Sequence, residues 1–201
     1  MAIAADDTAT ASKLLSEHPR LATATEPAGA TRQEAVANFF YEIGHYIYRG
    51  DTALHMAAAG YRVDVVRMLL DAGADVEAAN RRGARPLHYG ADGAVSHPNW
   101  NPLAQAQCIT MLINAGADPN ALDKSGVAPL HRAVRTRAAS AVSALLDGGA
   151  DPLLPNKSGS TPMQLAHWTT GRGGSGLPEA KAQQAEIVRI LERHGVKRDA
   201  T

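Results

Sequence analysis

The chain has 201 residues, and its 20 lysine and arginine residues are balanced by 20 aspartate and glutamate residues. Zero net charge excludes a protein-wide electric field that would draw the molecule onto nucleic acid or an anionic membrane. A single cysteine, Cys108, excludes an internal disulfide framework and favours a reducing, cytoplasmic location.

The N-terminal segment, residues 1–49, is predicted to be a helical cap. Its start, MAIAADDTATASKLL, lacks the basic and apolar regions of a secretory signal, and no membrane span is expected. SKLLSEHPRLATAT predicts a helix followed by a loop. Apolar residues then recur at helical spacing, which predicts an inserted helix over residues 31–46. We expect its side chains Phe39, Phe40 and Ile43 to pack on the segment that begins at residue 50 and to cover its apolar end.

From residue 50 onward the sequence repeats. Four related phrases (GDTALHMA, GARPLHYG, GVAPLHRA and GSTPMQLA) begin 33, 43 and 33 residues apart, at Gly50, Gly83, Gly126 and Gly159. Each phrase holds a helix start, marked by Thr161 as a cap in the last copy and by a proline at the first helical position in three copies. A second phrase of the type LLDAGADV comes after each and predicts a helix end at its glycine, as at Gly73, Gly116 and Gly149.

Each repeat is therefore predicted to hold an inner helix, a turn, an outer helix such as Val63–Asp71, and a projecting hairpin. A period of 33 residues carrying T-P-L-H-x-A resembles the ankyrin-repeat family, from Gly50 to about Lys197. This resemblance implies an all-α fold, an ankyrin-repeat α-solenoid with short β-hairpin or loop fingers. The four ankyrin-like repeats would span residues 50–82, 83–125, 126–158 and 159–201, with finger tips near residues 80–82, 123–125 and 156–158.

Two repeats carry extra residues, around residues 92–104 and 169–179. The spacing of the flanking motifs places both insertions between an inner and an outer helix, on one edge of the array. Insertions in repeat proteins map to loops on one face, which is often the binding face. We therefore expect a recess lined by Trp100, Arg137 and Trp168 between the two insertions.

The recurring histidines His55, His88 and His131 are predicted to hydrogen-bond to neighbouring loop backbone. A shared metal is not expected, because successive repeats lie about 10 Å apart and a metal–ligand distance is ~2 Å. GRGGSG, residues 171–176, matches a dinucleotide motif by letter but lacks the preceding strand. The sequence thus predicts no catalytic residue, no cofactor and no metal, and it does not indicate an enzyme.

The predicted function is non-catalytic protein–protein interaction through the hairpin tips, the inner-helix face and the insertion loops. The partner is another protein, nucleic acid is not the expected partner, and the chain is expected to be a monomer. Two alternatives remain open: a basic stripe that binds nucleic acid or an anionic ligand, and a small-molecule site or enzyme between the insertions. The candidate partner-binding residues are Arg49, Arg81, Arg82, Trp100, Lys124, Arg135, Arg137, Lys157, Trp168 and Arg172.

Overall fold

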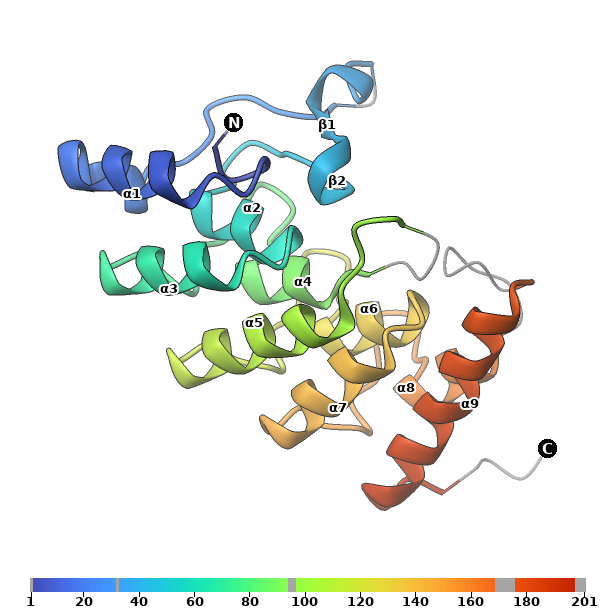
Figure 1. Ribbon diagram of the computed structural model, residues 1–201. Coiled ribbons are helices and arrows are strands. Elements are labelled where there is room, and N and C mark those ends of the chain that lie inside the picture. The colour runs from blue at the N-terminus through green and yellow to red at the C-terminus, as the bar shows by residue number, and fades with distance from the viewer. Residues whose placement is uncertain (1, 32, 94–96, 169–175, 198–201) are drawn as a thin grey trace.

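The computed structural model describes residues 2–31, 33–93, 97–168 and 176–197. Helix α1 is followed by a stack of four helix pairs in chain order, from the upper left to the lower right of Figure 1. The pairs are α2/α3, α4/α5, α6/α7 and α8/α9. The α-helices are α1 (Thr8–Glu17), α2 (Ala53–Ala59), α3 (Val63–Asp71), α4 (Pro86–Ala91), α5 (Pro102–Asn114), α6 (Pro129–Arg135), α7 (Ala139–Asp147), α8 (Pro162–His167) and α9 (Pro178–Arg193). The predicted all-α repeat solenoid is confirmed.

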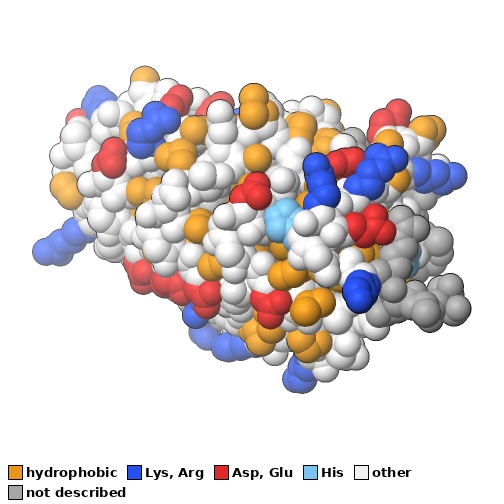
Figure 2. All heavy atoms as spheres, turned by 90° about the horizontal axis from the view of Figure 1, so that it is seen from below, with side chains coloured by type: hydrophobic (Ala, Val, Ile, Leu, Met, Phe, Trp, Pro, Cys, Tyr) orange, Lys and Arg blue, Asp and Glu red, His pale blue; other side chains and the backbone are white. Residues whose placement is uncertain are grey.

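Charged side chains are mixed on the face of the molecule shown in Figure 2. Lysine and arginine side chains alternate there with acidic and apolar ones. Among the residues drawn in colour, no continuous basic field covers this face.

The inner helices begin as the sequence predicts. Pro86, Pro129 and Pro162 each occupy the first helical position, where a missing N–H leaves no hydrogen bond unmade. In the last repeat, the Thr161 hydroxyl accepts from the N–H of Gln164 at 3.4 Å, and Gln164 Oε1 accepts from the N–H of Thr161 at 3.0 Å.

The recurring histidines join each repeat to the next. In each one, Nδ1 accepts a hydrogen bond from the backbone N–H three residues earlier, at 3.0 to 3.1 Å. Because Nδ1 accepts, the imidazole is neutral and its proton lies on Nε2. Nε2 then donates to a carbonyl in the following finger loop, and the three acceptors are Ala84, Val127 and Leu154. The predicted capping role of His55, His88 and His131 is confirmed.

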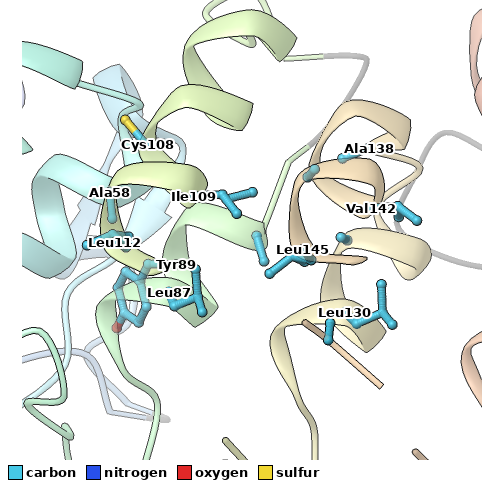
Figure 3. Close-up of a cluster of buried hydrophobic side chains, with 14 of the residues drawn as sticks. Ala58, Leu87, Tyr89, Cys108, Ile109, Leu112, Leu130, Ala138, Val142 and Leu145 are labelled. Carbon is cyan, nitrogen blue, oxygen red and sulfur yellow. The ribbon is translucent and has the colours of Figure 1, made fainter. Parts of the chain in front are cut away.

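One apolar core runs through the stacked repeats (Figure 3). Leu87, Leu112, Leu130 and Leu145 come from four successive helices, α4 to α7, and each is at most 2% exposed. Cys108 lies in this core, and burial raises the pKa of its thiol to about 12. The cysteine is therefore a packing residue rather than a reactive one.

The outer helices end at glycines in the left-handed conformation, with φ of 81° at Gly73, 101° at Gly116 and 91° at Gly149. An added Cβ at Gly149 would meet no atom within 4 Å, so only the backbone conformation opposes a side chain there. The predicted positive φ at these helix ends is confirmed.

We expect Gly149→Ala to lower the free energy of unfolding by about 1 kcal/mol, the cost of the left-handed conformation for an L-residue. Urea denaturation measures this change. Gly149→Asn is the matched control, because asparagine tolerates this conformation, and it should retain most of the stability. Equal stability of the alanine variant and the wild type would contradict the assignment.

The N-terminal segment caps the array, but part of it differs from the prediction. Helix α1 packs against α3, as an outer helix would. Arg62 of the first repeat donates to the carbonyl of Ala4 at 2.9 Å and pairs with Asp6 at 3.3 Å. A short 3-10 helix, η1 (Pro19–Ala22), then leads away from α1.

The predicted helix over residues 31–46 is wrong. The chain there forms two 3-10 turns, η2 (Val36–Asn38) and η3 (Tyr41–Ile43), and an antiparallel hairpin of β1 (Phe39–Phe40) and β2 (His45–Tyr46). Gly44, at φ 61°, reverses the chain inside the hairpin. Ile43 is buried and Phe40 packs on the core as expected, but Phe39 lies on the exposed side against Tyr46, with ring centroids 4.8 Å apart. The cross-strand aromatic pair and the turn glycine outweigh the helical spacing.

Both insertions leave their repeat between the inner and outer helix, as predicted, after α4 and after α8. The end of α4 is held by a two-part cap. Tyr61, in the left-handed turn of the preceding repeat, donates to the carbonyl of Asp92 at 2.5 Å. Gln105 of α5 donates to the carbonyl of Gly90 at 2.9 Å and more weakly to that of Asp92 at 3.3 Å.

The same cap recurs at the end of α8. Arg137 occupies the left-handed turn of its repeat, at φ 64°, and donates to the carbonyls of Ala166 and Trp168. Gln184 of α9 donates to these two carbonyls as well. Where an insertion replaces the tight interhelical turn, these side chains bind the carbonyls at the end of the inner helix.

Candidate functional site

A cleft of about 330 Å³ is formed by residues of the N-terminal segment and of the repeats. It lies between the β1–β2 hairpin, the finger loops of the first two repeats and the inner helices. Side chains that line it include Tyr46, Arg82, Trp100, Arg132 and Arg135. The cleft therefore joins segments that are far apart in sequence, from the hairpin to α6.

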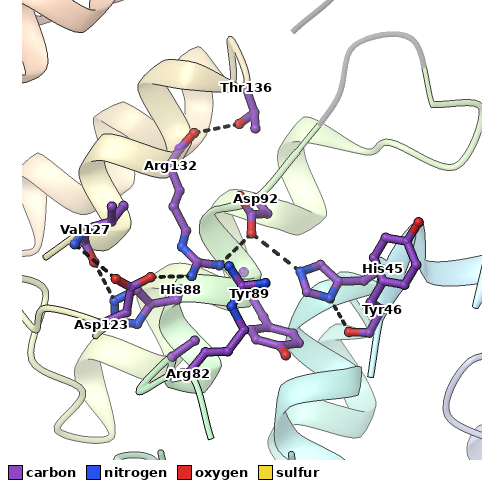
Figure 4. Close-up of polar contacts among 12 residues, drawn as sticks. His45, Tyr46, Arg82, His88, Tyr89, Asp92, Asp123, Val127, Arg132 and Thr136 are labelled. Atoms are coloured by element: carbon purple, nitrogen blue, oxygen red, sulfur yellow. Dashed lines mark hydrogen bonds and ion pairs between the residues drawn. The ribbon is translucent and has the colours of Figure 1, made fainter. Parts of the chain in front are cut away.

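The floor of the cleft is built on Arg132 (Figure 4). One guanidinium nitrogen contacts Asp92 Oδ2 at 2.8 Å, and the other contacts Asp123 Oδ2 at 2.8 Å. Burial alone would raise the pKa of the Asp92 carboxyl, but Arg132 and His45 outweigh it and hold the pKa well below its usual range. Both carboxylates are therefore charged at neutral pH, and the cluster ties the second repeat to the third.

The hairpin enters this cluster through His45 (Figure 4). Its Nε2 lies 3.5 Å from Asp92 Oδ2, and its Nδ1 lies 2.7 Å from the carbonyl of Tyr46. The imidazole also stacks on Tyr89, with ring centroids 4.0 Å apart. Tyr89 in turn donates to the buried carboxylate of Asp51 at 2.7 Å. The hairpin is thus anchored to the second repeat, and Tyr89 connects this contact to Asp51 of the first repeat.

The finger tips carry a row of cations, defined here as the tip row: Arg49, Arg81, Arg82, Lys124 and Lys157. All five are exposed. Arg82 Nη1 donates to Tyr48 at 2.9 Å, and the guanidinium carbons of Arg81 and Arg82 lie 5.4 and 4.9 Å from the Tyr48 ring centroid. The tip row is therefore open to solvent, and Tyr48 positions its two central arginines.

Among the residues that the structure describes, no member of the tip row forms an ion pair with a carboxylate, and neither does Arg135 at the rim of the cleft. Two acidic residues near the row, Asp51 and Asp123, do not neutralise it. Asp51 is buried against Tyr89 and Asn80, and Asp123 is buried against Arg132. Positive charge is therefore left available on this side of the array.

The remaining candidate partner-binding residues differ in their exposure and contacts. Arg137 is only 3% exposed and bound to backbone carbonyls, so its assignment to a partner-binding surface is wrong. Its side chain is committed because the insertion after α8 leaves those carbonyls without intrahelical partners. Trp168 is 49% exposed. Trp100 is half-buried, and its Nε1 donates to Gln105 at 2.9 Å. Arg172 lies outside the described residues.

The expected recess between the insertions is not formed by the described residues. Trp100 and Thr136 line the cleft, but Arg137 and Trp168 do not. Trp100 instead faces a space shared with His45 and Tyr46 of the hairpin. The cleft lies where it does because β1 and β2 fold over the inner helices, which the sequence analysis did not predict.

Sequence reasoning missed the central cluster of Asp92, Arg132 and Asp123. Arg132 follows a histidine that was interpreted only as a cap, and its partner Asp92 is 40 residues away across an insertion. One signal was present: Asp123 occupies the position that holds asparagine in the neighbouring fingers, at Asn80 and Asn156. A carboxylate at a finger position that is neutral in the neighbouring repeats indicates that a cation lies nearby.

The fold and the cleft define a class of protein: a solenoid of stacked helix-pair repeats whose loops and inner helices form one open surface. Two family models match within it. The model for an ankyrin repeat matches residues 49–81, and the model for ankyrin repeats in many copies matches residues 112–166. Both matches identify ankyrin repeats within the chain. The stretch between the two matches holds the first insertion.

Ankyrin repeats are generally protein–protein interaction modules and are typically non-catalytic. The described ranges contain no helix with the length and apolar character needed to cross a membrane. The class therefore directs attention to the open side of the array rather than to an enclosed catalytic pocket.

Proposed function

We propose that this chain is a non-catalytic module that binds another protein through the tip row and the adjoining cleft. The observation that carries the proposal is the cleft itself, to which three successive repeats and the hairpin contribute aromatic and arginine side chains. Tyrosine, tryptophan and arginine are the residues that dominate the energetics of protein interfaces.

The residues that we assign to this surface are those left exposed and without an ion pair in the described structure. They are Arg49, Arg81, Arg82, Lys124, Arg135 and Lys157. Trp168, which is half-exposed at the edge of the last repeat, is a second, separate contact candidate. Arg132 is excluded, because both faces of its guanidinium fork are occupied by carboxylates.

The organisation that supports this surface is also part of the proposal. Four repeats, at residues 50–82, 83–125, 126–158 and 159–201, follow a capping segment at residues 1–49. The free, buried Cys108 favours a reducing and hence cytoplasmic location. The chain acts as a monomer, so that its open side remains available to the partner.

Affinity capture from extracts of the source cells tests the function. The bait is the intact chain, and the test variant is Arg135→Glu, which reverses a charge at the rim of the cleft. Arg67→Glu is the matched control, because Arg67 is an exposed arginine on the outer helix α3.

We expect Arg135→Glu to reduce capture of a specific protein about tenfold, since rim charges govern electrostatic complementarity. Arg67→Glu should capture it as the wild type does. Both variants should melt within ~0.5 kcal/mol of the wild type. Equal capture by Arg135→Glu and Arg67→Glu would refute the proposed surface.

A further inference from the structure

The tip row is continuous from the first finger to the last. The backbone N–H of Arg81 donates to the carbonyl of Arg49 at 2.9 Å, and that of Lys124 donates to Arg82 at 2.9 Å. The N–H of Lys157 donates to the carbonyl of Gly126 at 3.1 Å. Each tip is therefore hydrogen-bonded to its neighbour, and the cations follow one another at the repeat spacing of about 10 Å.

The positions of the row's cations are partly fixed before any partner binds. Arg81 donates to the carbonyl of Ala30, and Lys124 Nζ donates to the carbonyl of Arg81 at 2.9 Å. Arg82 is held against Tyr48 by a hydrogen bond and by the ring face. Ordered cations lose less conformational entropy when an anion docks, which favours binding.

We propose that the partner presents an extended acidic segment that lies along the tip row, with carboxylates spaced about three residues apart. The inference rests on the proposed function and deepens it. An extended chain in the polyproline II conformation has three residues per turn and rises about 3.1 Å per residue, so every third side chain lies on the same face about 9 Å further along and can meet the next finger. Unneutralised cations on the row supply the complementary charge.

An acidic protein segment fits this row better than nucleic acid does. Nucleic-acid binding draws on many phosphate contacts and a broad positive field. This chain has zero net charge. The five cations of the tip row follow a line of finger loops and do not form a broad field. A narrow line suits one extended strand of carboxylates.

Fluorescence anisotropy with the full chain tests the inference. The probe is a labelled peptide of Glu-Ser-Thr repeats about twelve residues long, which is long enough to span the row. A second peptide has the same composition with its glutamates contiguous, and a labelled thymidine oligonucleotide represents nucleic acid. The test variant is Lys124→Glu with Lys157→Glu. The control, Arg67→Glu with Arg189→Glu, makes the same change in net charge on outer helices, where each arginine pairs with a carboxylate of its own helix.

We expect the wild-type chain to bind the spaced peptide, and to bind it more tightly than the contiguous peptide. The variant Lys124→Glu with Lys157→Glu should bind the spaced peptide about tenfold or more weakly than the wild type does. The control should change the affinity less than about twofold, and both variants should keep the wild-type melting temperature. Equal binding by test and control variants would overturn the inference. Equal affinity for the two peptides would overturn the extended arrangement, and binding of the oligonucleotide alone would replace the acidic segment with nucleic acid.

The captured protein separates this inference from the proposed function. If a partner is lost with Arg135→Glu but is unaffected by the Lys124 and Lys157 charge reversals, the function stands and the acidic-segment inference fails. If neither set of changes affects capture, the proposed binding surface fails as well.

Discussion

Replacing Arg132 with methionine should lower the free energy of unfolding by about 3 kcal/mol, the lower end of the range for breaking a buried ion pair. Arg132 neutralises Asp123, whose side chain is only 5% exposed, and also Asp92, which is more accessible to water. Methionine keeps much of the side-chain volume but leaves both carboxylates without their cation. Urea denaturation at neutral pH measures the loss.

Two further variants show whether the loss arises from uncompensated charge. Arg135→Met removes an exposed arginine from the same helix and should change stability by within ~0.5 kcal/mol. Adding Asp123→Asn to Arg132→Met removes the buried charge and should restore about 1 kcal/mol or more. Asparagine fits this position, since Asn80 Oδ1 accepts from the N–H groups of Arg82 and Ala84 in the equivalent finger. If Arg132→Met were as stable as Arg135→Met, the cluster of Asp92, Arg132 and Asp123 would not contribute to the stability of the fold.

The repeats could be predicted because their signals are local and occur in several copies. Pro129 begins α6, Gly149 ends the outer helix of that repeat, and His131 bonds to backbone three residues away. Each of these roles depends on backbone geometry within one turn. A sequence pattern that records a local backbone requirement can be interpreted without knowing the tertiary structure.

The N-terminal hairpin could not be predicted in the same way. Apolar spacing over residues 36–47 is compatible with one face of a helix, but the structure is decided by distant contacts. His45 approaches Asp92, and Asn99 donates to the carbonyl of Glu42 at 3.1 Å. Both partners lie in or beside the first insertion. Because this contact has only one copy in the chain, no periodic signal reveals it.

Arg137 shows the same limit within the repeats. It occupies a position where exposure was expected, at the end of an inner helix. The structure turns its side chain toward Ala166 and Trp168, because the second insertion leaves their carbonyls without partners. Its role therefore depends on the neighbouring repeat's insertion, while Arg135, two residues earlier, remains exposed.

Acidification between pH 6.5 and about 4 should destabilise the protein, and His88 should account for about 3 kcal/mol of the loss. Burial is the main cause that lowers the pKa of His88 to about 4, and the positive charge of Arg132 adds to it. The unfolded chain, with a histidine pKa near 6.5, binds the proton more tightly than the folded chain does. Stability is therefore complete above pH 6.5 and is lost as the pH falls through this window.

The chain itself offers the variant that isolates His88. Gln164 occupies the histidine position in the last repeat, where its Oε1 accepts from the N–H of Thr161 at 3.0 Å. His88→Gln should therefore keep the cap to Arg85, retain most of its stability at pH 7, and lose about 3 kcal/mol less than the wild type on acidification. His88→Ala, which cannot accept the bond, should be destabilised already at pH 7. Wild type and His88→Gln should both still lose some stability on acidification. His55 and His131 contribute to this common loss, because burial lowers their pKa values as well. Urea denaturation between pH 6.5 and about 4 measures the free energy of unfolding of the wild type, His88→Gln and His88→Ala. Parallel pH profiles for the wild type and His88→Gln would show that His88 does not cause the loss of stability.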